Sequence, residues 1–183
     1  MTSSLPAAPL REWQQHDAVS IVRHANDYDV WRFLRDRFPH PYTSQDAEAW
    51  LTRVCGASPA LDFAITLNDE AVGGIGLTPG TDIERVSAEV GYWLGRSVWG
   101  RGLASAALRS ITDYALHVLA LERLFALPFE GNLASARVLV KAGYRLEGTL
   151  RSAAIKEGRV TNLLLFACTR SDVRGTAANW SRH

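Results

Sequence analysis

The residues best suited to chemistry form a short basic turn that is rich in glycine. This turn, Trp99–Ala104 (WGRGLA), follows an apolar strand pattern and opens directly into a helix of small residues. Glycines let the backbone approach a ligand closely, and the first amides of a helix attract anions through the helix dipole. The turn therefore predicts a binding site for a phosphate or pyrophosphate group.

Two common phosphate-binding motifs do not fit this turn. A Walker A loop needs Lys and then Ser or Thr after its last glycine, where this chain has Leu103 and Ala104. The dinucleotide fingerprint needs a third glycine or an alanine where Ser105 stands, and it follows the first buried strand of its fold. The mismatches exclude the first motif and argue strongly against the second.

A lone carboxylate, Glu89, interrupts the apolar strand that precedes the turn. A charge in such a strand needs a reason, because burying an unpaired charge is costly. Glu89 could act as a base, or it could face solvent or pair with Arg85 or Arg11. The residue pattern alone leaves these interpretations open.

The composition favours one globular domain that does not bind nucleic acid or a membrane. The chain has 183 residues, and its 20 basic and 19 acidic side chains form no block of like charge. It shows no signal-peptide pattern and no apolar run of membrane-spanning length, so we expect a cytoplasmic protein. Cys55 and Cys168 lack metal-ligand or disulfide spacing, and we expect no metal.

The hydrophobic periodicity predicts helices and strands in mixed order. We expect helices at 18–25, 29–38, 45–54, 103–118 and 133–142, and strands at 10–13, 61–67, 71–77, 86–94, 124–127, 144–150 and 163–169. Residues 1–9 are expected to be a flexible lead-in, 10–170 the domain, and 171–183 a frayed tail in which Trp180 could dock. The order predicts a mixed α/β (α+β) domain with a central sheet flanked by helices.

The turn and its two flanking segments resemble the GNAT superfamily of N-acetyltransferases. The pyrophosphate pattern of that superfamily is matched by Gly102 and Ala104, while Trp99 replaces its first residue, Gln or Arg. The segments EVGYWLG (89–95) and NLASARVLVKAGYRLEG (132–148) occur in the family order. The resemblance covers residues 11–170 and is strongest to the ribosomal-protein N-terminal acetyltransferase (RimJ/RimL-like) branch, which commonly carries Trp-Gly at this turn.

The resemblance implies a single-domain GNAT fold with a mostly antiparallel, twisted sheet that splays apart where acetyl-CoA binds. Backbone amides of the turn would hold the pyrophosphate, the strand before it would pair with the pantetheine arm, and an asparagine would touch that arm. The residues implied to bind the coenzyme are Trp93, Leu94, Arg101, Gly102, Ala104, Ser105 and Asn132.

The resemblance also implies the catalytic groups. Glu89 would take a proton from the amine, directly or through water, and Ser135 would hydrogen-bond or protonate the departing sulfur. Ser135 is the candidate because Leu139 stands where many family members have a tyrosine. Asn162 stands where this branch usually has an aspartate. A plain helix cap at Asn132 and a surface serine at Ser135 remain alternatives.

The acceptor site is expected in the helix pair and loop that precede the sheet, where Trp31, Phe38, His40 and Tyr42 gather. The leading hypothesis is an acetyl-CoA-dependent N-acetyltransferase acting directly on a primary amine, such as a protein N-terminal α-amine or a small-molecule amine. The alternative is a non-catalytic CoA-binding or interaction module, which the missing tyrosine and Asn162 favour. The sequence leaves open whether the protein forms a homodimer in which the second subunit closes the site.

Overall fold

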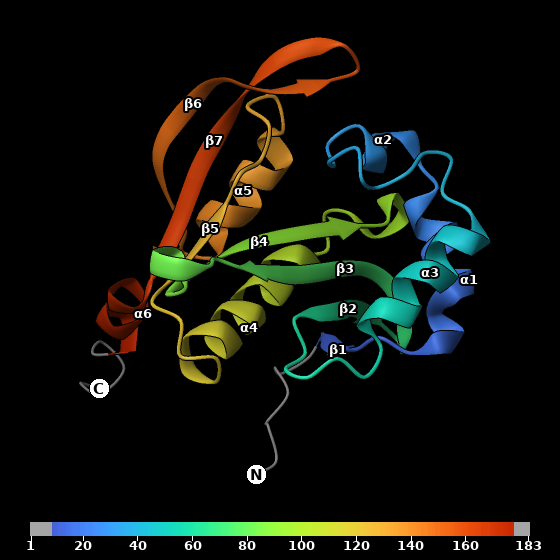
Figure 1. Cartoon of the computed structure of the whole chain (residues 1–183), viewed down its shortest axis with the longest axis horizontal. Coiled ribbons are helices and arrows are strands. Elements are labelled where there is room, and N and C mark those ends of the chain that lie inside the picture. Colours follow the sequence, from blue (N-terminus) through green and yellow to red (C-terminus); the bar gives the residue numbers. More distant parts are fainter. Residues whose placement is uncertain (1–8, 178–183) are drawn as a thin grey trace.

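A seven-stranded sheet organises the protein (Figure 1). The computed structural model describes residues 9–177, with side chains as far as residue 173. The strands are β1 (Leu10–Glu12), β2 (Asp62–Leu67), β3 (Glu70–Pro79), β4 (Ser87–Leu94), β5 (Arg123–Ala126), β6 (Arg145–Lys156) and β7 (Arg159–Thr169). Their order across the sheet is β1-β2-β3-β4-β5-β7-β6, and every neighbouring pair is antiparallel except β4 and β5.

Helices cover both faces of this sheet. They are α1 (Ala18–Ala25), α2 (Tyr28–Trp31), α3 (Ser44–Val54), α4 (Leu103–His117), α5 (Leu133–Lys141) and α6 (Arg170–Ala177). On one face α1 and α3 bury Ile21 and Leu51, and on the other α4 and α5 bury Leu108, Ile111 and Leu139. Burying each such side chain stabilises the fold by about 1.5–3 kcal/mol. This arrangement confirms the expected mixed α/β sheet flanked by helices.

Local sequence signals explain α4 and α5, the two helices that follow the turn Trp99–Ala104, which we call the phosphate turn. α4 is rich in alanine and leucine, which favour helix, and its apolar positions recur on one face. Asn132 caps the start of α5, and its side-chain oxygen accepts the Ser135 N–H at 3.1 Å. Two residues after the end of α5 stands Gly143, which has a φ of 92° that a glycine tolerates best. None of the helices within residues 9–177 is both long and apolar enough to cross a membrane.

The sheet splays apart between its only two parallel strands within the described residues. β4 pairs with β5 over its first three residues, Ser87–Glu89, and then continues to Leu94 without a partner on that side. Figure 1 shows β4 running away from β5 and β7. The expected splay is confirmed, and we call the unpaired side of β4 the open edge.

The predicted helix at 29–38 is wrong after Trp31. α2 ends there, and the chain continues through turns. The apolar and charged side chains that suggested a helix contact separate parts of the molecule. Phe33 lines a cavity, Arg35 reaches Glu89, and Phe38 packs on Trp93. One straight helix would not direct these three side chains to three different sites.

The chain after β7 also differs from the prediction, because residues 170–177 form α6 rather than a frayed segment. The side chain of Asp172 accepts hydrogen bonds from the N–H and the hydroxyl of Thr169 at 2.9 and 2.7 Å. The spacing Thr-x-x-Asp is a helix-start signal that the sequence offered. Trp180 lies outside the described residues.

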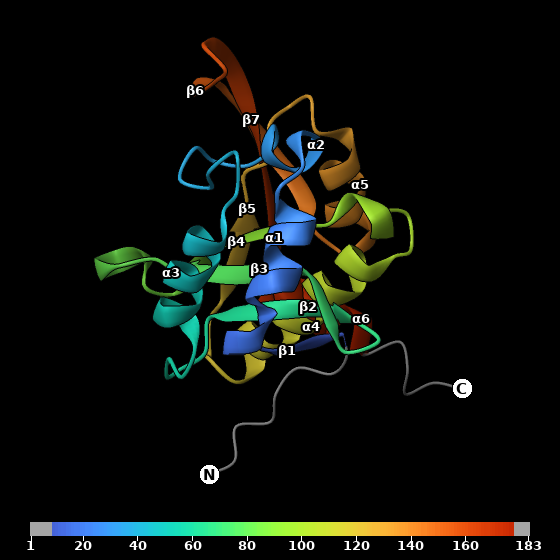
Figure 2. The same ribbon diagram turned by 90° about the vertical axis from the view of Figure 1, so that its right-hand side faces the viewer.

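The β6–β7 hairpin is longer than predicted. The two strands extend to Lys156 and Arg159 on either side of a turn at Glu157 and Gly158. Figure 2 shows the hairpin rising beyond the helices. In its outer half the apolar Ile155 and Val160, which pair with each other across the two strands, are both exposed, whereas the polar Lys156 is buried. The polar-apolar alternation that marks a half-buried strand is therefore missing there.

Candidate active site

The phosphate turn has the geometry that its sequence predicts. Gly100 and Gly102 both have a φ of 77°, a left-handed conformation that other residues rarely adopt. A Cβ placed on either glycine would meet nothing within 4 Å, so the space in front of the turn is open. No side chain caps the start of α4, which leaves its first amides available for an anion. The residues present fit the pyrophosphate of a coenzyme.

The other turn residues lie where their backbone, rather than their side chains, would meet such a ligand. Ala104 is half-buried and the Ser105 side chain is buried, whereas the Arg101 side chain is exposed. Small residues at 104 and 105 keep the first turn of α4 accessible. The guanidinium of Arg101 makes no ion pair within residues 9–177, so it is free to add positive charge.

Trp99, which departs from the superfamily pattern, ties the turn to the end of β4. Its indole N–H donates to the carbonyl oxygen of Leu94 at 2.7 Å. The ring is 46% exposed, so it packs along the surface rather than in the core. The indole thus satisfies the last carbonyl of β4 and leaves the N–H of Leu94 on the open edge.

The open edge of β4 carries the backbone groups of alternate residues. The N–H of Gly95 donates to the Val72 carbonyl oxygen of β3 at 2.8 Å. In an antiparallel pair of strands, every second residue along a strand is hydrogen-bonded to the neighbouring strand. Two residues back, Trp93 therefore turns its backbone towards β3, while Tyr92 and Leu94 turn theirs to the open edge. The indole of Trp93 packs against Phe38 on the α1 and α3 face. The edge suited to pairing with pantetheine thus belongs to Tyr92 and Leu94, not to Trp93.

Glu89 is held by an arginine that the sequence did not identify. Its carboxylate accepts a hydrogen bond from Arg35, which lies in the turns after α2. Arg85 and Arg11, the partners considered from sequence, bond instead to the Asp82 carbonyl and the Asp17 carboxylate. The Glu89 side chain is 27% exposed and lies where β4 and β5 part. It is therefore accessible to an amine brought to the open edge.

Ser135 lies on the opposite face of β4, where it meets a tyrosine. Its hydroxyl is 2.7 Å from the hydroxyl of Tyr92, which also lies 3.3 Å from the Ser135 carbonyl oxygen. Burial raises the pKa of Tyr92 to about 12, so this phenol keeps its proton at neutral pH. Sequence reasoning missed Tyr92, although its place in the strand alternation put it on the face opposite Glu89. A candidate base and a pair of hydroxyl donors thus flank the open edge.

Comparison with known proteins decides the family. Residues 9–145 match the model of the acetyltransferase (GNAT) domain. The chain belongs to the GNAT acetyltransferase family. This confirms the resemblance seen in the phosphate turn and its flanks.

Relatives of this acetyltransferase match it over different shares of its length. It is 28% identical over 169 residues to the uncharacterized N-acetyltransferase p20 of Bacillus licheniformis, covering 91% of this chain and 94% of the relative. It is 30% identical over 105 residues to the ribosomal-protein-serine acetyltransferase of Escherichia coli, covering 57% and 58%. The structure of Mycobacterium smegmatis RimJ in complex with CoA-disulfide superposes with a TM-score of 0.78 at 26% identity, covering 93% and 88%.

The four aromatic and polar residues expected to recognise the acceptor separate into two groups in this acetyltransferase. Tyr42 is buried and Phe38 half-buried, and their rings pack 4.8 Å apart in the core beneath α1 and α3. Trp31 and His40 stack at 5.3 Å nearer the surface. The ammonium of Lys156, from the β6–β7 hairpin, lies 3.7 Å from the centre of the Trp31 ring. Only the second group faces the hairpin.

Asn162 has a structural part in the acetyltransferase. Its side-chain oxygen accepts the Ser152 N–H at 2.8 Å, and its amide donates to Glu130 at 2.9 Å. These bonds join a bulge in β6 to the loop between β5 and α5. An amide makes both bonds because it donates and accepts, which an ionised aspartate cannot do. No group of three or more His, Cys, Asp or Glu side chains in the described part could hold a metal ion.

Proposed function

We propose that this acetyltransferase moves the acetyl group of acetyl-CoA directly onto the α-amine of a peptide or protein N-terminus. The observation that carries the proposal is the open edge of β4, with Glu89 on one face and the Tyr92–Ser135 pair on the other. One relative supports a protein acceptor, since it is named a ribosomal-protein-serine acetyltransferase, and the structure of RimJ in complex with CoA-disulfide supports the coenzyme.

The phosphate turn and the open edge would hold the coenzyme. Amides of Gly102 to Ser105 would bind the pyrophosphate, and the amide-bearing pantetheine arm would pair with the backbone of Tyr92 and Leu94. Asn132 would reach the same arm, because its amide nitrogen has no hydrogen-bond partner among the described residues while its oxygen caps α5. When bound, acetyl-CoA supplies an activated acetyl thioester.

Glu89 would accept the proton that the acceptor amine must lose. A lysine side chain with a pKa of about 10.4 costs roughly 4.6 kcal/mol to deprotonate at pH 7, whereas an α-amine with a pKa of ~7.7–8.0 costs only about 1–1.4 kcal/mol. A carboxylate acting directly or through one water suffices for the smaller cost. This difference favours the α-amine as the acceptor.

Tyr92 and Ser135 would stabilise the sulfur as the carbon–sulfur bond breaks. Ser135 would donate the hydrogen bond to the sulfur. Tyr92 could then replace the donated proton, because its own hydroxyl is protonated at neutral pH. The backbone of Ser135 is fixed by Asn132, so the hydroxyl starts from one defined position. This pair would take over the task that the family resemblance assigns to a tyrosine at the position of Leu139.

Acetyl-CoA turnover on a mixed acceptor panel tests this function. Peptides with a free N-terminus, the same peptides blocked by acetylation, polyamines and aminoglycosides are each offered with acetyl-CoA, and released CoA is measured with a thiol reagent. We expect the free peptides to be turned over and the blocked ones not. CoA binding in calorimetry without turnover on any acceptor would support the non-catalytic module instead. The cytoplasmic location and a homodimer stay predictions, and light scattering tests the second.

A further inference from the structure

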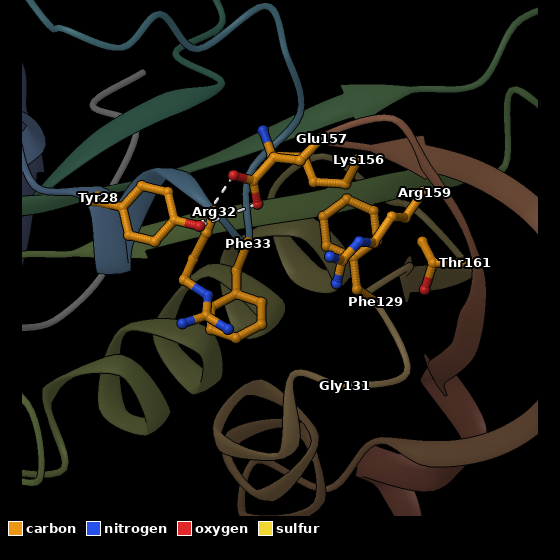
Figure 3. Close-up of a pocket in the computed structure, with 9 residues that line it drawn as sticks. All are labelled: Tyr28, Arg32, Phe33, Phe129, Gly131, Lys156, Glu157, Arg159 and Thr161. Atoms are coloured by element: carbon orange, nitrogen blue, oxygen red, sulfur yellow. Dashed lines mark hydrogen bonds between the residues drawn. The ribbon is translucent and has the colours of Figure 1, made fainter.

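A cavity of about 430 Å³ lies between the segment after α2, the loop between β5 and α5, and the tip of the β6–β7 hairpin (Figure 3). Its size falls in the range of roughly 300–1,000 Å³ typical of sites for small ligands. Phe33 and Phe129 supply apolar walls. None of the four residues expected from sequence to bind the acceptor lines it.

The cavity lies beside the segments that carry the hydrogen-bond partners of Glu89 and Ser135. Phe33 lines it and stands two residues before Arg35, which holds Glu89. Gly131 lines it on the other side and directly precedes Asn132, which fixes the position of Ser135. These chain connections place the cavity beside the segments that carry Arg35 and Asn132, and in the proposed site an acceptor whose amine reaches Glu89 would extend into it.

The lining carries three cations and one carboxylate. Arg159 makes no ion pair within the described residues, and its side chain lines the cavity from the start of β7. The guanidinium carbon of Arg32 lies 4.9 Å from the centre of the Phe33 ring, and one of its guanidinium nitrogens lies 3.5 Å from a carboxylate oxygen of Asp29. The Lys156 ammonium is largely buried and bonds to Asp36 at 2.8 Å. Arg159 is therefore the cation most available to a ligand.

The one carboxylate of the lining is already engaged. Glu157, at the hairpin turn, accepts a hydrogen bond from the Tyr28 hydroxyl at 2.9 Å, as the dashed lines in Figure 3 show. This bond joins the hairpin to α2 and gives the cavity its outer wall. Glu157 keeps its negative charge, and the three cations of the lining outnumber it.

We propose that this cavity binds acidic side chains that follow the α-amine of the acceptor peptide. The proposal rests on the proposed function and names its substrate class. A guanidinium binds a carboxylate through two parallel hydrogen bonds, and the phenylalanine rings would contact the methylene groups of Asp or Glu. A basic segment would meet Arg159 and Arg32 as like charges and would bind less well.

Three peptides of equal length with the same N-terminal serine test the proposal. Residues two to four are all acidic in the first, all glutamine in the second and all lysine in the third. We expect kcat/KM for the acidic peptide to exceed that for the basic one by about ten-fold or more at low ionic strength, and salt to reduce this ratio. Equal values for the acidic and basic peptides would overturn the proposal.

Two arginine variants assign the preference to the cavity. Arg159→Gln removes the available cation, and we expect it to reduce the acidic-to-basic ratio by about five-fold. Arg85→Gln removes an exposed arginine at the far end of β4, where it bonds to the Asp82 carbonyl, and should leave the ratio unchanged. A ratio that falls equally in both variants, or in neither, would contradict the assignment.

Peptide binding separates this proposal from the proposed function. Fluorescently labelled acidic and basic peptides are titrated with the CoA-bound protein, and anisotropy gives their affinities without any turnover. Tighter binding of the acidic peptide that is lost in Arg159→Gln supports the cavity even if no acceptor is acetylated. Turnover without any charge preference in binding or rate would retain the acetyltransferase and overturn the acidic acceptor.

Discussion

The coenzyme side and the acceptor side of the open edge are built from different parts of the chain. On the coenzyme side the proposed binding groups are backbone amides of the turn at Gly102 and of β4, held by regular elements. On the acceptor side the proposed binding groups are long charged and aromatic side chains from three separate segments, such as Arg32 and Arg159. A binding site made of backbone groups keeps its specificity when most side chains are substituted, whereas a binding site made of side chains changes its specificity with each substitution. One scaffold can therefore keep its coenzyme and vary its acceptor.

The largest effect is expected from a substitution in the phosphate turn, on the coenzyme side. Gly102→Glu places a carboxylate where the pyrophosphate would lie, and we expect the affinity for CoA to fall by about 100-fold or more. Calorimetry measures this affinity.

Gly56→Glu is the matched control, because Gly56 has the same φ of 77° and equally open space but lies at the end of α3. Both variants should lose a similar amount of stability, about 1–2 kcal/mol, from a left-handed non-glycine residue. Equal CoA affinity in the two variants would remove the turn from the coenzyme site.

Glu89→Gln tests the proposed base, where the two sides meet. We expect kcat to fall by about 100-fold, the lower range for loss of a general base. The remaining rate should increase with pH up to the pKa of the acceptor amine, because the amine must then lose its proton unaided. Initial rates from pH 6 to 9.5 give the profile.

Glu147→Gln serves as its control, since Glu147 is also a strand carboxylate paired with an arginine, Arg123. Its kcat and pH profile should match those of the unmodified protein. A Glu89→Gln profile identical to that of the unmodified protein would make Glu89 a structural residue.

Tyr92→Phe tests the hydroxyl pair on the coenzyme face. We expect a fall in kcat of about ten-fold, as expected when one hydrogen bond to a developing charge is removed. Ser135→Ala should cost a similar factor, and the double variant little more than the larger single loss, because the two hydroxyls act together.

The buried pair of Tyr144 and Thr112 provides the comparison, since their hydroxyls also lie 2.9 Å apart but on the core side of α4. Tyr144→Phe should affect stability more than kcat. Fully additive losses in Tyr92→Phe and Ser135→Ala would show that the two hydroxyls act independently.

The smallest expected effect comes from Arg35→Gln on the acceptor side. Arg35 occupies the carboxylate that an incoming ammonium would need, and exposed ion pairs contribute only about 0–1 kcal/mol. We therefore expect KM for the glutamine-containing peptide to fall by about two- to five-fold. Arg23→Gln, which breaks the exposed pair with Glu70, should leave KM unchanged. A higher KM in Arg35→Gln would mean that Arg35 helps to bind the acceptor.

Local signals in the sequence predicted the structure around the turn well. Three features depend on residues that are close together in the sequence, so the sequence shows them directly. They are the glycines of the turn, the Asn132 cap and the apolar face of α4. The same reasoning failed for residues 32–38, whose helix-like spacing serves contacts with separate parts of the fold. It also missed α6, although the Thr169 and Asp172 capping pair was present in the sequence.

Contacts between distant residues could not be predicted. The Tyr92–Ser135 hydrogen bond joins residues 43 apart in sequence, and the Arg35–Glu89 bond joins residues 54 apart. Each depends on which strand faces which helix, and a polar residue gives no local sign of that. The cavity is a still clearer case, because three segments meet there only after the hairpin has extended past the sheet.

The indole of Trp99 gives this protein a built-in optical reporter. It is one of six tryptophans, and it alone lies on the phosphate turn while bonded to the end of β4. Because the ring is nearly half exposed, a ligand that covers the turn changes the polarity around it and hence its emission. The difference in fluorescence between the unmodified chain and Trp99→Phe isolates that signal. The same hydrogen bond joins the turn to the end of β4, the two parts of the proposed coenzyme site, so the emission of one residue would report on both.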